Sequence, residues 1–280
     1  EDVAAHLDQG QFGMAREFGY INAALLEGQH RLIGFGQALG QLICDSDFRR
    51  AVEKRLNLDH PIVFKHPEVS LIAACHQHNI PLTVHVGIGT DVIDQHPNFD
   101  GSAKGGCSGR DFLIYTQHVT NLDKGGVVLN IGSAVTGPEV LLKAVSMAGN
   151  INRPPCRIVT ADFDLKPYHL NAMNDESNCC YYFRHHKSVA TRIPAAFQGQ
   201  GLYIQGDQRR TVPRLYQLIF NNFNPALAPA HNLLKKLPVR DHDLAQLPQY
   251  RENKIFSMIF ELVTGSELSS RIEDEYINIV

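Results

Sequence analysis

The sequence predicts an α/β protein built on a parallel sheet, and two observations lead to that prediction. Between residues 60 and 165, stretches whose apolar residues have helical spacing alternate with short β-rich stretches. Residues 127–131 form a nearly continuous apolar run, which is typical of a strand buried on both faces. An alternation of helix and strand at this rhythm favours parallel strands with helices on both faces of the sheet.

The first part of the chain is expected to be helical. Helices are predicted over residues 12–26, 29–44 and 47–56, because apolar residues recur every three or four positions. Gly34, Gly36 and Gly40 lie in the second of these helices, with a spacing one residue too long for a dinucleotide fingerprint and with no strand before them. We therefore attribute these glycines to close packing between helices.

The remaining elements follow in sequence order. We expect an extended piece over 60–67, a helix over 68–79, a strand over 80–89, a helix over 109–123, a strand over 125–133, a helix over 137–150 and a strand over 156–165. Two further strands, 188–193 and 201–207, and two helices, 212–223 and 250–263, complete the prediction. The chain is expected to form a single domain over 1–280, with residues 224–280 as a helical extension.

The start of the chain is unusual, because it begins at Glu1 without a methionine and enters a helical pattern almost at once. An upstream segment that belongs to the protein is one explanation, and a trimmed leader is the other.

Composition excludes several classes of partner. The net charge of −3 gives no basic surface for nucleic acid or an anionic membrane. No apolar run approaches the roughly 20 residues that a membrane span needs. The six cysteines form no CxxC pair, so we expect reduced thiols in a cytoplasmic protein rather than a disulfide framework or a zinc knuckle.

Candidate functional residues follow three of the predicted strands. In an open parallel sheet, ligands bind beyond the carboxyl ends of the strands. After residues 125–133 come Gly132, Ser133 and Ala134, which let a ligand approach the backbone. Gly137 then opens a helix whose N-terminus favours a phosphate or a carboxylate, although a plain capped turn is the alternative.

Carboxylates follow the other two predicted strand ends. Asp91 and Asp94 are candidates for binding ribose hydroxyls or a substrate ammonium group, and Asp94 with His96 is a candidate metal pair. Asp162 and Asp164 alternate on one strand and therefore share a face. We favour Asp162 as the ligand-binding residue, because it lies nearer the body of the strand.

Lys187 is the candidate nucleophile or proton carrier. It follows a run of aromatic residues, and burial among them would lower its pKa. A solvated loop that faces anions is the alternative for this segment. Cys179 and Cys180 are adjacent, and buried packing explains them better than redox chemistry.

The segments "HNIPLTVHVGIGTDVID" and "GGVVLNIGSAVTGPEV" resemble the deoxyhypusine synthase family, most closely a poorly characterised bacterial branch of it. The resemblance covers residues 68–164, about a third of the chain. It implies a Rossmann-like, deoxyhypusine synthase-like NAD/FAD-binding fold, NAD as the cofactor, and a dimer or tetramer. It also implies an enzyme that removes a hydride from an amine-bearing small substrate, with group transfer as a further step.

The resemblance implies that Asp91 lies in the ligand crevice and that Gly132 and Ser133 lie near the cofactor. Together with the candidates from the strand ends, the expected cofactor-binding set is Gly132, Ser133, Ala134, Gly137 and Asp162; the expected substrate-binding set is Asp91 and Glu139; and the catalytic candidates are Lys187, Asp94 and His96. The family's catalytic lysine lies in a Trp-Gly-Lys motif, whereas this chain has no tryptophan, and Pro138 and Glu139 stand where the family has a histidine pair.

The sequence leaves two other functions open. One is a non-catalytic ligand-binding or assembly protein on the same fold, and the other is a metal-dependent enzyme that uses Asp94 and His96.

Overall fold

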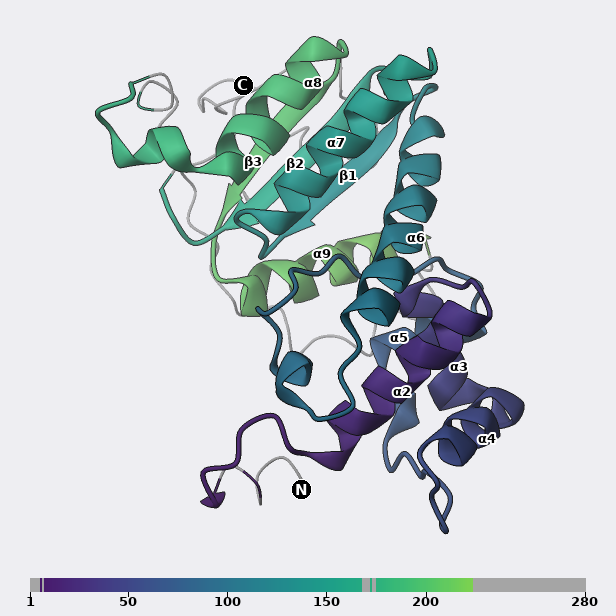
Figure 1. The fold of residues 1–280 in the computed structure, drawn as a ribbon. Coiled ribbons are helices and arrows are strands. Elements are labelled where there is room, and N and C mark those ends of the chain that lie inside the picture. The colour runs from purple at the N-terminus through teal and green to yellow at the C-terminus, as the bar shows by residue number, and fades with distance from the viewer. Residues whose placement is uncertain (1–5, 7, 168–171, 173–174, 224–280) are drawn as a thin grey trace. The chain divides into compact units, whose positions relative to one another are not determined.

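The computed structural model describes residues 6, 8–167, 172 and 175–223 (Figure 1). The chain forms two compact units, Glu1–His118 and Val119–Val280, here called unit 1 and unit 2. The predicted helix over 250–263 and the predicted extension over 224–280 lie outside the described residues.

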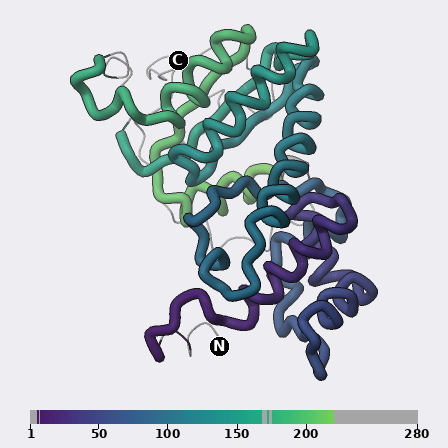
Figure 2. The backbone as a smooth tube through the Cα atoms, viewed as in Figure 1, coloured from purple at the N-terminus to yellow at the C-terminus, as the bar shows by residue number. Residues whose placement is uncertain are grey.

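Unit 1 is helical in its described part, as predicted for the start of the chain. Its helices are α2 (Arg16–His30), α3 (Phe35–Cys44), α4 (Ser46–Arg55), α5 (Leu71–Gln77) and α6 (Gly101–Thr120), with short 3₁₀ turns at Pro67–Val69 and Val92–Gln95. Figure 2 follows the backbone through these helices. Apolar side chains from α2, α3 and α4, among them Leu25, Leu39 and Phe48, form its core.

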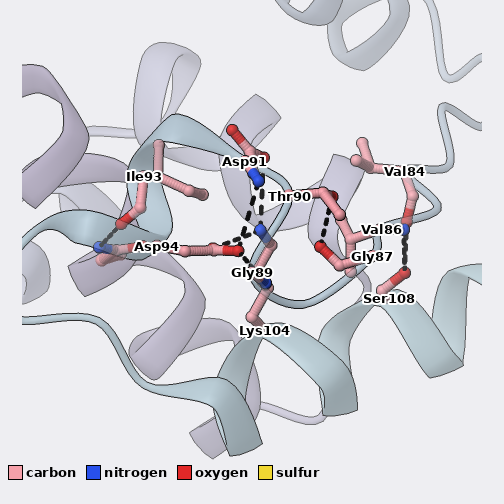
Figure 3. A network of polar contacts seen from close by, with 11 residues as sticks. Val84, Val86, Gly87, Gly89, Thr90, Asp91, Ile93, Asp94, Lys104 and Ser108 are labelled. Atoms are coloured by element: carbon pink, nitrogen blue, oxygen red, sulfur yellow. Dashed lines mark hydrogen bonds and ion pairs between the residues drawn. The ribbon is translucent and has the colours of Figure 1, made fainter. Parts of the chain in front are cut away.

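The strand predicted over 80–89 is wrong. Residues 80–86 have no strand partner and pair instead with side chains of α6. The N–H of Val84 donates to Asp111 Oδ2 at 2.8 Å. The N–H of Val86 donates to Ser108 Oγ at 3.2 Å (Figure 3). Because these side chains satisfy the backbone of an apolar, β-branched segment, its strand propensity is not expressed as a sheet.

Close approach explains the glycines of α3. A Cβ added to Gly36 would lie 1.8 Å from the carbonyl oxygen of Leu82, and one added to Gly34 would lie 1.9 Å from Asp111 Oδ1. The same carboxylate accepts the Gly36 N–H at 2.9 Å and so caps the start of a helix whose N-cap, Gly34, has no side chain. These contacts confirm packing rather than nucleotide binding as the reason for the glycines.

The Gly36→Ala variant is expected to lower the free energy of unfolding by about 1–3 kcal/mol, because backbone must move to admit the methyl group. Gly105→Ala in α6 is the matched control. A Cβ there meets nothing within 4 Å, so the variant should gain about 0.5–1 kcal/mol from helix propensity. Urea denaturation followed by circular dichroism measures both, and equal shifts in the same direction would contradict the close approach.

Unit 2 contains an open sheet of three parallel strands in the order β1-β2-β3, namely β1 (Gly126–Ile131), β2 (Ile158–Asp164) and β3 (Gln200–Gln205). This confirms an α/β fold with a parallel sheet and the predicted strands over 125–133, 156–165 and 201–207. The central strand β2 is buried on both faces, with Asp162 and Phe163 almost inaccessible to solvent. The predicted burial of residues 127–131 on both faces is wrong, because β1 is an edge strand of this sheet and Leu129 and Ile131 are 38% and 40% exposed.

Helices connect and cover these strands. α7 (Thr136–Asn150) joins β1 to β2, and a π-helical segment (His186–Arg192) followed by α8 (Ile193–Ala196) leads into β3. Figure 1 shows α7 and the segment from His186 to Ala196 over the same face of the sheet. α9 (Gln208–Phe223) also packs against β2 and confirms the helix predicted over 212–223.

The strand predicted over 188–193 is wrong, because residues 188–192 lie in the π-helical segment and Ile193 begins α8. Val189, Thr191 and Ile193 are β-branched, which favours a strand, but hydrogen bonds within the segment and to β2 stabilise the helical conformation. The hydroxyl of Thr191 donates to the carbonyl of His186 at 2.8 Å, and the hydroxyl of Thr160 on β2 donates to the carbonyl of Val189. Tertiary contacts thus override local propensity.

Candidate functional site

In unit 1, hydrogen bonds and ion pairs of Asp94 hold the loop that follows residue 86 (Figure 3). Asp94 Oδ2 accepts the N–H of Gly89 at 2.7 Å, and Asp94 Oδ1 lies 2.5 Å from the ammonium nitrogen of Lys104. Lys104 is fully buried, and its Nζ lies 3.3 Å from Asp91 Oδ2. Burial raises the pKa of Asp94, but the Lys104 ammonium and the Gly89 N–H outweigh it, so the net pKa is lowered.

Asp94 and His96, the two catalytic candidates in this loop, make contacts within the chain. Both carboxylate oxygens of Asp94 are satisfied within the chain, and only 7% of its side chain is exposed. The ring of His96 lies against Gly19, with Nδ1 2.5 Å from Asn98 Oδ1. Asp91 is more accessible, because 40% of its side chain is exposed.

Unit 2 has a pocket of about 330 Å³ at the carboxyl ends of its three strands. Residues from the end of β1, the end of β2, the start of α9 and the segment before the π-helix line it. These residues are Asn130, Gly132, Ser133, Ala134, Phe163, Asp164, Leu165, His185, Asp207, Gln208 and Arg209. Gly132, Ser133 and Ala134 are therefore pocket residues, at the sheet edge where the sequence predicts ligand binding.

The turn between β1 and α7 is built around two glycines. Gly132 has φ +75°, a conformation that favours glycine. Gly137 lies close to β1, and a Cβ there would come within 2.9 Å of Asn130 Oδ1 and Ser133 Cβ. The Gly137 N–H donates to Ser133 Oγ at 2.7 Å, and Pro138 has no N–H, so this helix start offers fewer free donors than its sequence suggests.

Asp164 and His185 face each other on the wall of the pocket. His185 Nε2 lies 2.7 Å from Asp164 Oδ2, and His185 Nδ1 lies 3.1 Å from the carbonyl oxygen of Ala134. Burial raises the pKa of Asp164, but hydrogen bonds from His185 and from the N–H of Leu165 lower it overall.

Asp162 lies on the same face of β2 as Asp164 but does not line the pocket. Asn130 Nδ2 donates to Asp162 Oδ1 at 2.6 Å. Burial is the main cause that raises the pKa of Asp162 to about 6, and burial also lowers the pKa of the neighbouring His186 to about 4. Asp162, His185 and His186 are the one group in the described part of the chain whose ligand atoms are close enough to share a metal ion.

Lys187 and Glu139 do not line this pocket. The ammonium nitrogen of Lys187 lies 3.3 Å from the centroid of the Tyr181 ring. Partial burial, with Arg192 and Arg184 nearby, lowers the pKa of Lys187. Glu139 forms ion pairs with Lys143 and with Arg184, the latter at 3.6 Å.

Sequence reasoning missed two parts of this site. The histidine pair 185–186 directly precedes Lys187, and an adjacent pair of histidines just before a predicted strand is a signal that could have been used. The second part is the segment from Asp207 to Arg209 after β3. Arg209 binds both carboxylate oxygens of Asp207, and this bond, with the Arg209 N–H, lowers the pKa of Asp207 to about 2.

In the described part of the chain, no helix has both the length and the apolar character that crossing a membrane requires. Comparison with known proteins assigns no family to the chain, since no protein-family model, no curated protein and no solved structure matches it.

Proposed function

We propose that unit 2 is a Rossmann-like nucleotide-binding unit that takes NAD in the pocket at the carboxyl edge of its sheet. The observation that carries this proposal is the arrangement of β1, α7 and β2. Gly132 follows β1 with a positive φ, Gly137 lets the start of α7 lie close to β1, and Asp164 ends β2. In mononucleotide-binding βαβ units, glycines with these two roles approach the phosphates and an acidic residue at the end of the second strand binds the ribose.

The volume of the pocket indicates how much of the cofactor it would hold. A volume of about 330 Å³ lies at the lower end of the range for small-molecule sites, so it suits one nucleotide half rather than a whole dinucleotide. Arg209, whose side chain is 88% exposed, and the N-terminus of α7 supply positive potential for a phosphate. Asp164 supplies an acceptor for a ribose hydroxyl.

We further propose that the protein belongs to the deoxyhypusine synthase-like class and acts as an enzyme on a small amine. NAD, when bound, accepts a hydride from the carbon next to nitrogen. The chain's own contribution would be to hold the ligand at the turn Gly132–Ser133 and to offer the Asp164 carboxylate to an ammonium group or a ribose hydroxyl. Homo-oligomer formation and a cytoplasmic location complete this proposal, and six free thiols support the location.

Calorimetric titration of NAD into the purified chain tests the cofactor. We expect saturable binding that weakens about tenfold in the Arg209→Ala variant, because one charge-assisted contact to phosphate is lost. Arg50→Ala removes an arginine that is also exposed, but in unit 1, and should leave the affinity unchanged. The absence of binding heat, or equal affinity in all three proteins, would contradict NAD binding at this pocket.

A second candidate is a ligand-binding protein without catalysis on the same fold. The placement of Lys187 against Tyr181 favours it, because the described lining of the pocket contains no lysine that could act as a nucleophile. Normal NAD binding without oxidation of any amine in a panel of diamines and polyamines would support this second function over the enzyme.

A further inference from the structure

We propose that Asp162, His185 and His186 hold a divalent first-row transition-metal ion of the Zn²⁺ or Fe²⁺ type beside the unit 2 pocket, whose wall includes His185. This inference goes beyond nucleotide binding and needs no nucleotide. One ligand atom from each of the three side chains lies within 4.8 Å of the others, and all three residues are buried.

The fold brings the three ligands together from two segments. β2 places Asp162 and Asp164 two residues apart, so both carboxylates lie on the face that the π-helical segment covers. That segment begins at His186, and His185 precedes it directly. The ring of His186 packs edge-on against the ring of Tyr203, with centroids 4.6 Å apart, and this contact restricts its orientation.

One carboxylate oxygen of Asp162 accepts no hydrogen bond, which indicates a binding position for a cation. The residue is fully buried, and its Oδ1 accepts from Asn130, but its Oδ2 has no hydrogen-bond partner. No lysine or arginine forms an ion pair with it in the described part of the chain. A buried carboxylate oxygen without a hydrogen-bond donor is costly, and a metal ion would satisfy it.

His185 is oriented as a metal ligand. Its Nδ1 lies 3.1 Å from the carbonyl oxygen of Ala134, and a carbonyl can only accept, so Nδ1 carries the hydrogen. In the structure Nε2 forms a hydrogen bond with Asp164 Oδ2, 2.7 Å away. Because Nδ1 is held by the carbonyl of Ala134, Nε2 is the nitrogen that would ligate the ion once the proton between it and Asp164 has left. A ligating histidine whose other nitrogen donates to a backbone carbonyl is the usual outer-sphere arrangement of metal sites.

The donor set decides the class of ion. Two imidazoles and one carboxylate suit Zn²⁺ or Fe²⁺, whereas Mg²⁺ and Ca²⁺ prefer oxygen ligands throughout. Ligand atoms around such an ion lie about 3.3 Å apart when each bond is about 2.0–2.1 Å, so closing from 4.8 Å requires only small side-chain movements. Because His185 and Asp164 line the pocket, a remaining coordination position of the ion would face it.

The test uses the full chain, stripped with a chelator and then titrated with Zn²⁺ against a chromophoric competitor. We expect one equivalent to bind, with affinity about 100-fold lower in Asp162→Asn and in His186→Gln, and about tenfold lower in Asn130→Ala, which removes the outer-sphere amide. His78→Gln, which replaces an exposed histidine of unit 1, is the matched control and should bind as the unaltered chain does. Mg²⁺ should not compete.

Two measurements keep the outcome clear. Co²⁺ substituted into the unaltered chain should give visible absorption bands of a site with low coordination number, and this does not depend on how any variant folds. Zn²⁺ binding that is the same in the His186→Gln and His78→Gln variants, or the absence of Co²⁺ bands, would overturn the proposal. Measuring Zn²⁺ without NAD, and NAD with a chelator present, separates failure of this site from failure of the nucleotide site.

Discussion

The Lys104→Met variant is expected to lose about 3–5 kcal/mol of unfolding free energy in unit 1 at neutral pH. Lys104 is completely buried, and its ammonium group pairs with Asp94, whose side chain is only 7% exposed. Methionine keeps most of the volume but leaves the Asp94 carboxylate buried without its cation. The loss therefore comes from the stranded charge rather than from a cavity.

A surface ion pair provides the matched control. Lys143→Met removes an exposed lysine that pairs with Glu139 four residues earlier, and such pairs contribute about 0–1 kcal/mol. Adding Asp94→Asn to Lys104→Met should restore part of the lost stability, because the unpaired charge is gone. Urea denaturation of the four proteins measures this, and equal effects of the Lys104 and Lys143 variants would show that the buried pair adds nothing.

The Asp162→Asn variant is expected to be more stable than the unaltered chain at pH 7 by about 3 kcal/mol when a chelator is present. The folded protein raises the pKa of Asp162 from 3.8 to about 6, so between these values it holds a proton that the unfolded chain has released. Stability from this group is therefore highest below pH 4 and is lost as the pH rises to 6. Asparagine does not titrate, and its oxygen still accepts from Asn130.

The difference in unfolding free energy between variant and unaltered chain isolates this effect. It should grow from pH 4 to pH 7 when measured by urea denaturation. Asp175→Asn is the control, because hydrogen bonds from Ser177 lower the pKa of Asp175, so that variant should lose relative stability as the pH rises toward 4 and change little from pH 4 to pH 7. A difference for Asp162→Asn that stays flat across this range would mean that burial does not perturb the carboxyl group.

Such a gain would have a functional meaning. A residue whose replacement stabilises the fold at neutral pH is retained at a cost, and such residues are typical of binding and catalytic sites. The same substitution is expected to weaken metal binding, so the Asp162→Asn variant would gain folding stability and lose metal affinity.

Much of the fold could be predicted from the sequence because its signals were local. The strand Gly126–Ile131 and the helix Thr136–Asn150 follow from apolar runs, a glycine turn and a proline in the first helical turn. The errors came from non-local partners. Residues 80–86 are rich in β-branched side chains, yet Asp111 and Ser108 accept hydrogen bonds from their backbone, and no local sequence pattern indicates those partners.

The site was predicted in part for the same reason. Gly132 and Ser133 lie where a parallel sheet binds ligands, so the general rule for strand ends was sufficient to find them. His185 was missed because its importance depends on Asp164, 21 residues earlier, and on the carbonyl of Ala134, 51 residues earlier. The spacing of these residues in the sequence does not indicate that they are in contact.

The π-helical segment fixes the direction in which His185 and His186 point. A π turn holds more residues per turn than an α-helix, and such turns are frequent at functional sites. A deletion of one residue between His186 and Thr191 would return the segment to α-helical register and turn its start by about 100° relative to α8. Both imidazoles would then leave Asp164. The register of this turn, together with the identity of residues 185 and 186, would decide whether the chain keeps two imidazoles beside Asp164.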